Sequence, residues 1–110
     1  MKTIVETLAK RGIVCKHLEP LAPKELGSRK RVEIYRGVET DDYYCMVIVV
    51  RKKSRILRKE AAEYIELHRR LEEKMGAKVK RRYLLLGAPI CSKAAAMLEE
   101  EGWKIIPMKG

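Results

Sequence analysis

A run of eight apolar residues, YYCMVIVV at positions 43–50, constrains this chain more than any other feature. The run is rich in β-branched residues and lacks alternating polar positions, so it predicts a strand that is buried on both faces. Strands of this kind lie inside α/β sheets, with helices above and below them. A basic segment, RKKSR, and a long helical pattern follow directly. We therefore expect a strand, a basic turn and a helix as the central unit of the fold.

The segment after Ser54 carries one apolar stripe at spacings of three and four residues, which is the period of a helix. Ser54 is a good N-cap, Gly76 ends the pattern, and Glu66 with Arg70 forms a favourable pair one turn apart. We interpret the histidine of the stripe as a residue at the edge of the core. The stripe consists of Leu57, Ala61, Tyr64, Ile65, His68, Leu71 and Met75.

The other elements follow from the same two periods. We expect helices at 2–11 and 92–101, and strands at 13–18, 31–36, 79–86 and 103–106, with a loop from Pro20 to Lys30. The short turn at 37–42 predicts an antiparallel hairpin, and Pro107 favours a sheet edge for the last strand. The order α-β-β-β-α-β-α-β predicts one three-layer α/β domain over residues 1–110. Its mixed sheet should have a parallel second half with right-handed crossovers.

Charge and cysteine usage narrow the class of protein. Lys and Arg total 25 against 15 acids, a net charge of +10, which favours a nucleic acid or another polyanion as partner; the alternative is that the charge only maintains solubility. Charged residues make up 36% of the chain, as is typical of heat-adapted proteins with surface ion pairs.

Three cysteines without metal-site spacing predict a reducing cytoplasm and no zinc site. The sequence shows no apolar N-terminal run and no stretch near 18 apolar residues, so we expect neither a secretion signal nor a membrane span.

Two basic helix starts should meet at one edge of the sheet, because parallel strands place their carboxyl ends together. Helix N-termini favour anions, yet here cations gather there, and the last helix has Lys93 at its start and acids from Glu99 to Glu101 at its end. A bound phosphate would compensate this reversal; the alternative is a solvated charge run screened by salt. The predicted phosphate-binding residues are Arg51, Lys52, Lys53, Ser54, Arg55, Arg58, Lys59, Ser92 and Lys93.

Further basic residues and one cysteine lie outside this set. Arg29, Lys30, Arg31 and Arg36 could extend the phosphate-binding surface, whereas Lys78, Lys80, Arg81 and Arg82 should lie at the opposite end of their strand. Cys91 lies at a predicted helix start, but no His or Asp is near it in the sequence. We interpret it as a buried thiol of the cap region rather than as a nucleophile.

The element order and the RKKS turn resemble the restriction-endonuclease-like, PD-(D/E)XK nuclease fold of archaeal Holliday-junction resolvases and related restriction enzymes. The resemblance implies a thermophilic archaeal source, an acidic residue on the second strand, and an E-x-K or Q-x-K triplet ending the third. The triplet position falls at Val49-Val50-Arg51, and the candidate acids are Glu33, Asp41 and Asp42. Metal-dependent cleavage needs carboxylates around Mg²⁺, and valine cannot supply one.

The leading hypothesis is therefore a nuclease-like domain that binds DNA or RNA through phosphates, without catalysis and without a cofactor. One alternative is an active Mg²⁺-dependent endonuclease that uses Glu33, Asp41 or Asp42 with Lys52 or Lys53. Another is a structural or interaction subunit, or a small-anion site in a Rossmann-like half-domain. A homodimer is expected through an exposed sheet edge. Aromatic residues are only 5% of the chain, which argues against base-stacking platforms.

Overall fold

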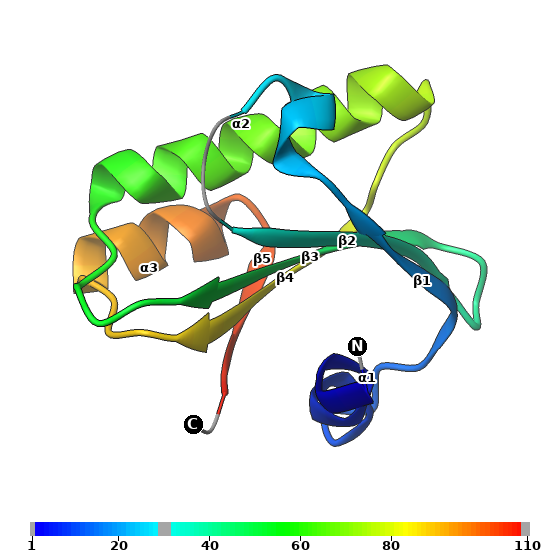
Figure 1. Ribbon diagram of the computed structural model, residues 1–110, viewed down its shortest axis with the longest axis horizontal. Coiled ribbons are helices and arrows are strands. Elements are labelled where there is room, and N and C mark those ends of the chain that lie inside the picture. The colour runs from blue at the N-terminus through cyan, green and yellow to red at the C-terminus, as the bar shows by residue number, and fades with distance from the viewer. Residues whose placement is uncertain (1, 29–31, 109–110) are drawn as a thin grey trace.

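The apolar run at 43–50 forms the central strand of the structure. The computed structural model describes residues 2–28 and 32–108, and its third strand of five, β3, is buried from end to end apart from its first and last residues. The described elements, in chain order, are α1 (Lys2–Ala9), β1 (Cys15–Leu21), the short 3-10 helix η1 (Pro23–Leu26), β2 (Glu33–Glu39), β3 (Tyr44–Arg51), α2 (Arg58–Met75), β4 (Arg81–Gly87), α3 (Ser92–Glu100) and β5 (Trp103–Pro107) (Figure 1).

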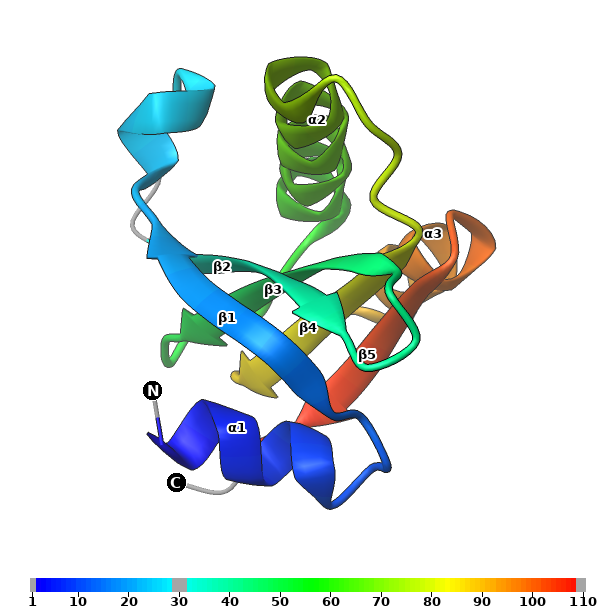
Figure 2. The ribbon, with the colours of Figure 1, turned by 90° about the vertical axis from the view of Figure 1, so that its right-hand side faces the viewer.

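The sheet is mixed, as the sequence predicts. Its spatial order is β1-β2-β3-β4-β5, with β1, β2 and β3 antiparallel and β3, β4 and β5 parallel. The helices α2 and α3 cover one face of the sheet and α1 covers the other, which gives three layers (Figure 2). The predicted fold class and element order are thereby confirmed.

Side chains alternate between two hydrophobic cores along β3. Met46, Ile48 and Val50 pack beneath α2 and α3, while Val47 and Val49 pack against α1. All five are buried, with at most 3% of their surface exposed. Because both faces of β3 are covered, an uninterrupted apolar run replaces the alternating pattern of a strand with one wet face.

The N-terminal part departs from the expected boundaries. The strand β1 continues through Pro20 to Leu21, where the sequence predicts a loop. Proline is tolerated there because β1 is an edge strand, so one side of its backbone needs no partner. Gly27, with φ of 71°, then ends η1 in the left-handed conformation that glycine adopts without strain. The predicted basic residues Arg29, Lys30 and Arg31 lie outside the described residues.

The start of α2 corrects a second expectation. Ser54 is not the N-cap; the helix begins at Arg58, after an extended Leu57. The intervening Ile56 is fully buried and pairs with Ile90 in an isolated parallel bridge. Burial of the isoleucine side chain, at about 25 cal/mol per Å² of apolar surface, outweighs the local preference for a serine cap. The chain therefore stays extended past Ser54.

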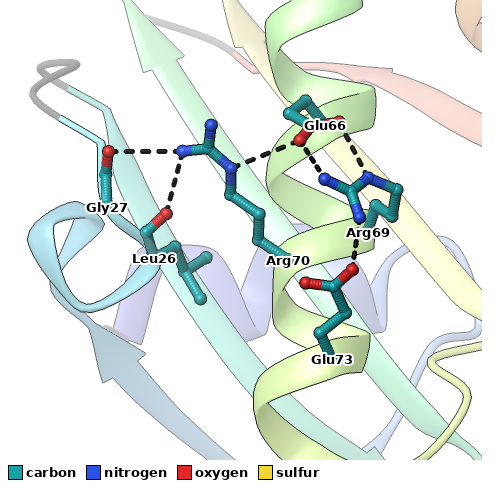
Figure 3. A network of polar contacts seen from close by, with 6 residues as sticks. All are labelled: Leu26, Gly27, Glu66, Arg69, Arg70 and Glu73. Carbon is teal, nitrogen blue, oxygen red and sulfur yellow. Dashed lines mark hydrogen bonds and ion pairs between the residues drawn. The ribbon is translucent and has the colours of Figure 1, made fainter.

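A polar network fastens η1 to α2 (Figure 3). The Arg70 guanidinium donates through Nη1 to the carbonyl oxygens of Leu26 and Gly27, at 3.0 and 3.2 Å. Its Nε lies 3.3 Å from Glu66 Oε1, which confirms the pair expected from the sequence. Arg69 contacts Glu66 and Glu73 on the exposed side of the same helix. The network thus joins segments 43 residues apart in the chain.

The sheet has two edges, and each carries a proline. Pro20 lies in β1, and Pro107 lies in β5, whose edge position the sequence predicts correctly. A proline cannot donate to a neighbouring strand, which limits pairing between chains. The homodimer stays a prediction. Among the described residues, no helix is both long enough and apolar enough to cross a bilayer.

Candidate nucleic-acid interface

The loops that precede α2 and α3 run side by side. The Ile56 N–H donates to the Pro89 carbonyl at 2.9 Å, and the Cys91 N–H donates to the Ile56 carbonyl at 2.9 Å. Both loops leave the carboxyl ends of parallel strands, β3 and β4, at the left in Figure 1. The two helix starts therefore share one edge of the sheet, as the crossover topology requires.

The sequence-predicted phosphate-binding residues lie along this edge, and we call them the basic rim. They come from the end of β3, the loop before α2, and the first turns of α2 and α3. All are exposed except one lysine, Lys52, which is half-buried. The basic rim comprises Arg51, Lys52, Lys53, Ser54, Arg55, Arg58, Lys59, Ser92 and Lys93.

Two cations of the basic rim have acidic partners. Arg51 Nη1 lies 3.4 Å from Glu33 Oε2, and Lys52 contacts Glu60. Within the part of the chain that the structure describes, the other cations of the rim have no acidic partner. These unpaired cations are Lys53, Arg55, Arg58, Lys59 and Lys93.

The start of α2 is less basic than the sequence suggests. Glu60 lies in its first turn, and its Oε1 accepts a 3.4 Å hydrogen bond from the Leu57 N–H. The negative charge of Glu60 interacts favourably with the positive end of the helix dipole and with Lys52. The helix α2 therefore supplies part of the negative charge that balances its basic start. No acid lies in the first turn of α3. The reversal of helix charge therefore holds for α3 and only partly for α2.

Cys91 is the N-cap residue of α3, without a side-chain cap hydrogen bond, and it is half-buried rather than buried. The backbone N–H groups of Ala94 and Lys93, together with the positive charges of Arg55 and Lys93, lower the pKa of Cys91 below its ordinary value. The same features favour any anion at this position. The pKa of the Cys91 thiol is therefore sensitive to the positive charges of the basic rim.

The residues at the triplet position do not form a metal site. Glu33 pairs directly with Val49 across β2 and β3, and Arg51 follows two residues later on the same face. Val49 is 1% exposed and packs in the core beneath α1. Glu33 is the one carboxylate of these three residues, and the other two carry a hydrocarbon side chain and a guanidinium. The residues present therefore do not fit a metal site that needs a second carboxylate at position 49.

The other candidate acids lie at the opposite end of the sheet. Asp41 and Asp42 are in the turn between β2 and β3, where Asp41 Oδ2 contacts Arg81 at 2.8 Å and Asp42 contacts Lys16. Lys52 follows the far end of β3, so the structure separates these aspartates from it. Over residues 2–28 and 32–108, no three His, Cys, Asp or Glu side chains gather in a way that could hold a metal.

The remaining basic residues lie away from the basic rim. Arg36 is in the middle of β2 and pairs with Glu19 at 2.7 Å, so it does not extend the rim. Arg81 and Arg82 begin β4 at the opposite end of the sheet, as expected. Sequence reasoning missed Ile56, which joins the two loops. A single apolar residue inside a charged segment, SRILRK, was the available signal.

Comparison with known proteins gives structural likenesses alone. The chain matches no protein-family model and no curated protein sequence. A repair endonuclease from Pyrococcus abyssi superposes with a TM-score of 0.55 at 20% identity, over 86% of this chain and 39% of that one. EndoMS in complex with dsDNA gives 0.58 at 18% identity, over 98% and 44%. EndoMS in the apo form gives 0.58 at 19%, over 99% and 46%.

This chain spans less than half the length of each of these proteins. The likeness extends over nearly all of it, and it includes the helix, the three-strand meander and the parallel second half. With the element order and the mixed sheet, these likenesses show that the chain has the restriction-endonuclease-like fold.

Proposed function

We propose that this domain binds double-stranded DNA through the phosphate backbone at the basic rim and does not cleave it. One observation carries the proposal: Lys53, Arg55, Arg58, Lys59 and Lys93 share one sheet edge without an acidic partner in the described chain. Like charges held together raise the free energy of the folded chain unless an anion lies among them. A polyphosphate backbone meets that requirement.

The backbone adds to the side-chain charge. The first turn of α3 offers backbone N–H groups and the positive end of a helix dipole, with no acid in that turn. The lowered pKa of Cys91 reflects the same potential. Backbone N–H groups contact phosphates without regard to base sequence. We therefore expect binding with little sequence preference.

Duplex DNA is the ligand that the comparisons favour. EndoMS, a structural neighbour, was solved with dsDNA. Exposed aromatic side chains near the basic rim, on which unpaired bases could stack, are absent from the described residues. Binding by charge alone favours the denser charge of a duplex over that of a single strand.

The residues at the triplet position support the proposed absence of cleavage. Arg51 and Val49 stand beside Glu33, where metal-dependent cleavage needs further carboxylates. Arg51 pairs with Glu33 at 3.4 Å, so a guanidinium lies beside the carboxylate that would otherwise help to hold a metal ion.

Fluorescence anisotropy with a labelled DNA duplex tests the proposal. Log affinity should fall with log salt, by about 0.9 for each phosphate neutralised. Lys53→Ala/Arg55→Ala/Lys93→Ala should weaken binding at least about tenfold and flatten the slope by about 1 for each lysine or arginine removed. The matched control is Lys24→Ala/Lys74→Ala/Lys78→Ala, which removes the same charge at exposed positions away from the rim.

No binding at low salt, or an equal loss in both triple variants, would remove the proposed interface. Tighter binding to duplex RNA or to single strands would overturn the choice of duplex DNA. Supercoiled plasmid and branched DNA should stay intact with Mg²⁺ or Mn²⁺. Nicking by the wild-type protein, absent from Glu33→Gln, would overturn the claim that the domain does not cleave.

A further inference from the structure

We infer a second anion site in a separate cavity, at the opposite end of β4 from the basic rim, that takes a phosphate or pyrophosphate group. The cavity has a volume of about 260 Å³. Its lining includes five cations and one acid: Arg11, Lys80, Arg81, Arg82, Lys104 and Glu39. The cations come from the turn after α1, from the start of β4 and from β5, so only the tertiary fold brings them together.

Arg81 is the fixed element of this cavity. Its Nη1 donates to Glu39 Oε1 and its Nη2 to Asp41 Oδ2, both at 2.8 Å. Glu39 is 4% exposed and also accepts a 2.8 Å hydrogen bond from the Tyr83 hydroxyl. These contacts hold the guanidinium in one place but also neutralise it. The net positive charge of the cavity therefore comes from the other four cations.

Arg82 is only partly satisfied by the protein. Its Nη2 donates to the Glu101 carbonyl at 2.7 Å, at the end of α3, and its Nη1 lies 3.5 Å from the Val79 carbonyl oxygen and 3.4 Å from His68 Nε2. Its buried Nε has no hydrogen-bond partner among the residues that the structure describes. A buried donor without an acceptor is costly, so the protein holds this guanidinium at its Nη atoms and leaves Nε unsatisfied.

Helix capping explains some of these cations but not all. Cations stabilise helix C-termini, which accounts for Arg82 at the end of α3 and for Arg11 two residues after the end of α1. Lys80 directly precedes β4 and Lys104 lies in β5, so neither follows a helix. In the described chain, neither lysine has an acidic partner, and Lys80 Nζ lies only over the Tyr43 ring, at 5.1 Å. These lysines and Arg11 are exposed, so salt partly screens their mutual repulsion, and an anion in the cavity would offset it directly.

The size of the cavity selects the ligand class. Pockets for organic ligands usually measure about 300–1,000 Å³, so this cavity suits a small, highly charged anion. The anion could be free pyrophosphate or the terminal phosphate of a nucleic acid; the recognising chemistry is the same. β4 has seven residues and spans about 20 Å at ~3.3 Å per residue, so this site is distinct from the basic rim.

Calorimetric titration of the chain with pyrophosphate at low salt tests the site. Arg11→Ala/Lys104→Ala should weaken pyrophosphate binding at least about tenfold, because two charge-assisted contacts are lost. The control Lys10→Ala/Lys78→Ala removes equal charge from exposed residues that do not line the cavity, and it should change affinity less than about twofold. Competition by 5′-phosphorylated against 5′-hydroxyl duplexes distinguishes a nucleic-acid end from free pyrophosphate as the source.

Thermal unfolding separates this site from simple helix capping. If the cations repel one another around an empty cavity, Lys104→Gln, which caps no helix, should melt at or above the wild-type temperature without anion. Added pyrophosphate should raise its melting temperature less than it raises that of wild type. No binding of pyrophosphate, equal losses in both double variants, or a lower melting temperature of Lys104→Gln without anion would overturn the inference. Variants of the basic rim should leave pyrophosphate binding here unchanged, so this test does not depend on the DNA proposal.

Discussion

Glu33 of β2 lies directly across from Val49 of β3, and its carboxylate meets Arg51 at 3.4 Å. A hydrocarbon and a cation therefore occupy the two positions that we align, from the sequence, with the carboxylate and the lysine of metal-dependent nucleases of this fold. This relationship makes the alignment of the triplet testable.

Val49→Glu/Arg51→Lys should create a site whose stability depends on metal. Two neighbouring carboxylates at a buried position repel each other and resist ionisation without a cation. The variant should melt below wild type in EDTA and regain several degrees with Mn²⁺, because metal binds only the folded chain. Val47→Glu is the control, since Val47 is equally buried but pairs with Tyr35. An equal Mn²⁺ response in both variants would contradict the alignment.

Gly37→Ala should destabilise the sheet by more than about 2 kcal/mol, because the new methyl group cannot be accommodated. A Cβ at this position would lie 2.4 Å from the His17 carbonyl oxygen and 3.3 Å from Cys45 Sγ. The free energy of unfolding in urea measures the loss. Gly87→Ala, where the nearest atom would be 3.4 Å away, should cost much less. Comparable losses at the two glycines would show that strand flexibility, not close approach, governs both.

His68 should make stability depend on pH between about 5.5 and 7.5. Burial lowers the pKa of His68, although the Val79 carbonyl at 2.8 Å and Glu72 at 3.5 Å oppose the shift and Arg82 adds to it. The unfolded chain therefore binds a proton that the folded chain resists, so stability is lost as pH falls through the unfolded value. Urea unfolding of His68→Gln should lack this slope, and that of His17→Gln should keep it. A slope that survives in His68→Gln would assign it to another group.

Alkylation of Cys91 should report the potential of the basic rim. Its pKa is lowered first by the Ala94 N–H and then by the Lys93 N–H, with the charges of Arg55 and Lys93 adding to the effect. Arg55→Ala should move the pH profile of iodoacetamide alkylation at Cys91 to higher pH, as followed by peptide mass spectrometry. Arg58→Ala removes a charge from the rim that has no part in this shift, and it should leave the profile in place. Identical profiles for wild type and Arg55→Ala would argue against the potential we describe.

Arg70→Ala should release η1 from α2, while Arg69→Ala should not. Arg70 donates to two backbone carbonyl oxygens of the η1 turn, so its loss should cost about 1 kcal/mol and speed amide exchange in residues 26–28. Arg69 contacts only Glu66 and Glu73 of its own helix among the described residues, and its substitution should leave that exchange unchanged. Equal exchange in both variants would mean that apolar packing of Leu26 alone holds the turn.

Local sequence determined most of the architecture. The unbroken apolar run at 43–50 required a strand covered on both faces, and the helical stripe after it required a crossover. From these two elements followed the parallel second half and the shared edge of two basic helix starts. Buried apolar residues recur along the chain with the period of the helix or strand that carries them, and this period can be read from the sequence alone.

The tertiary structure alone decided which charges meet. Because Ile56 pairs with Ile90, the chain stays extended and α2 begins at Arg58. In this arrangement Glu60 contacts Lys52. In the folded chain, Asp41 contacts Arg81 at the end of the sheet opposite the basic rim. Arg11 and Lys104 line the same cavity. Such pairings depend on strand register and on helix placement across long sequence separations, and they leave no periodic trace in the chain. The sequence therefore determined the frame of the fold, while three-dimensional packing determined which residues of that frame can act together.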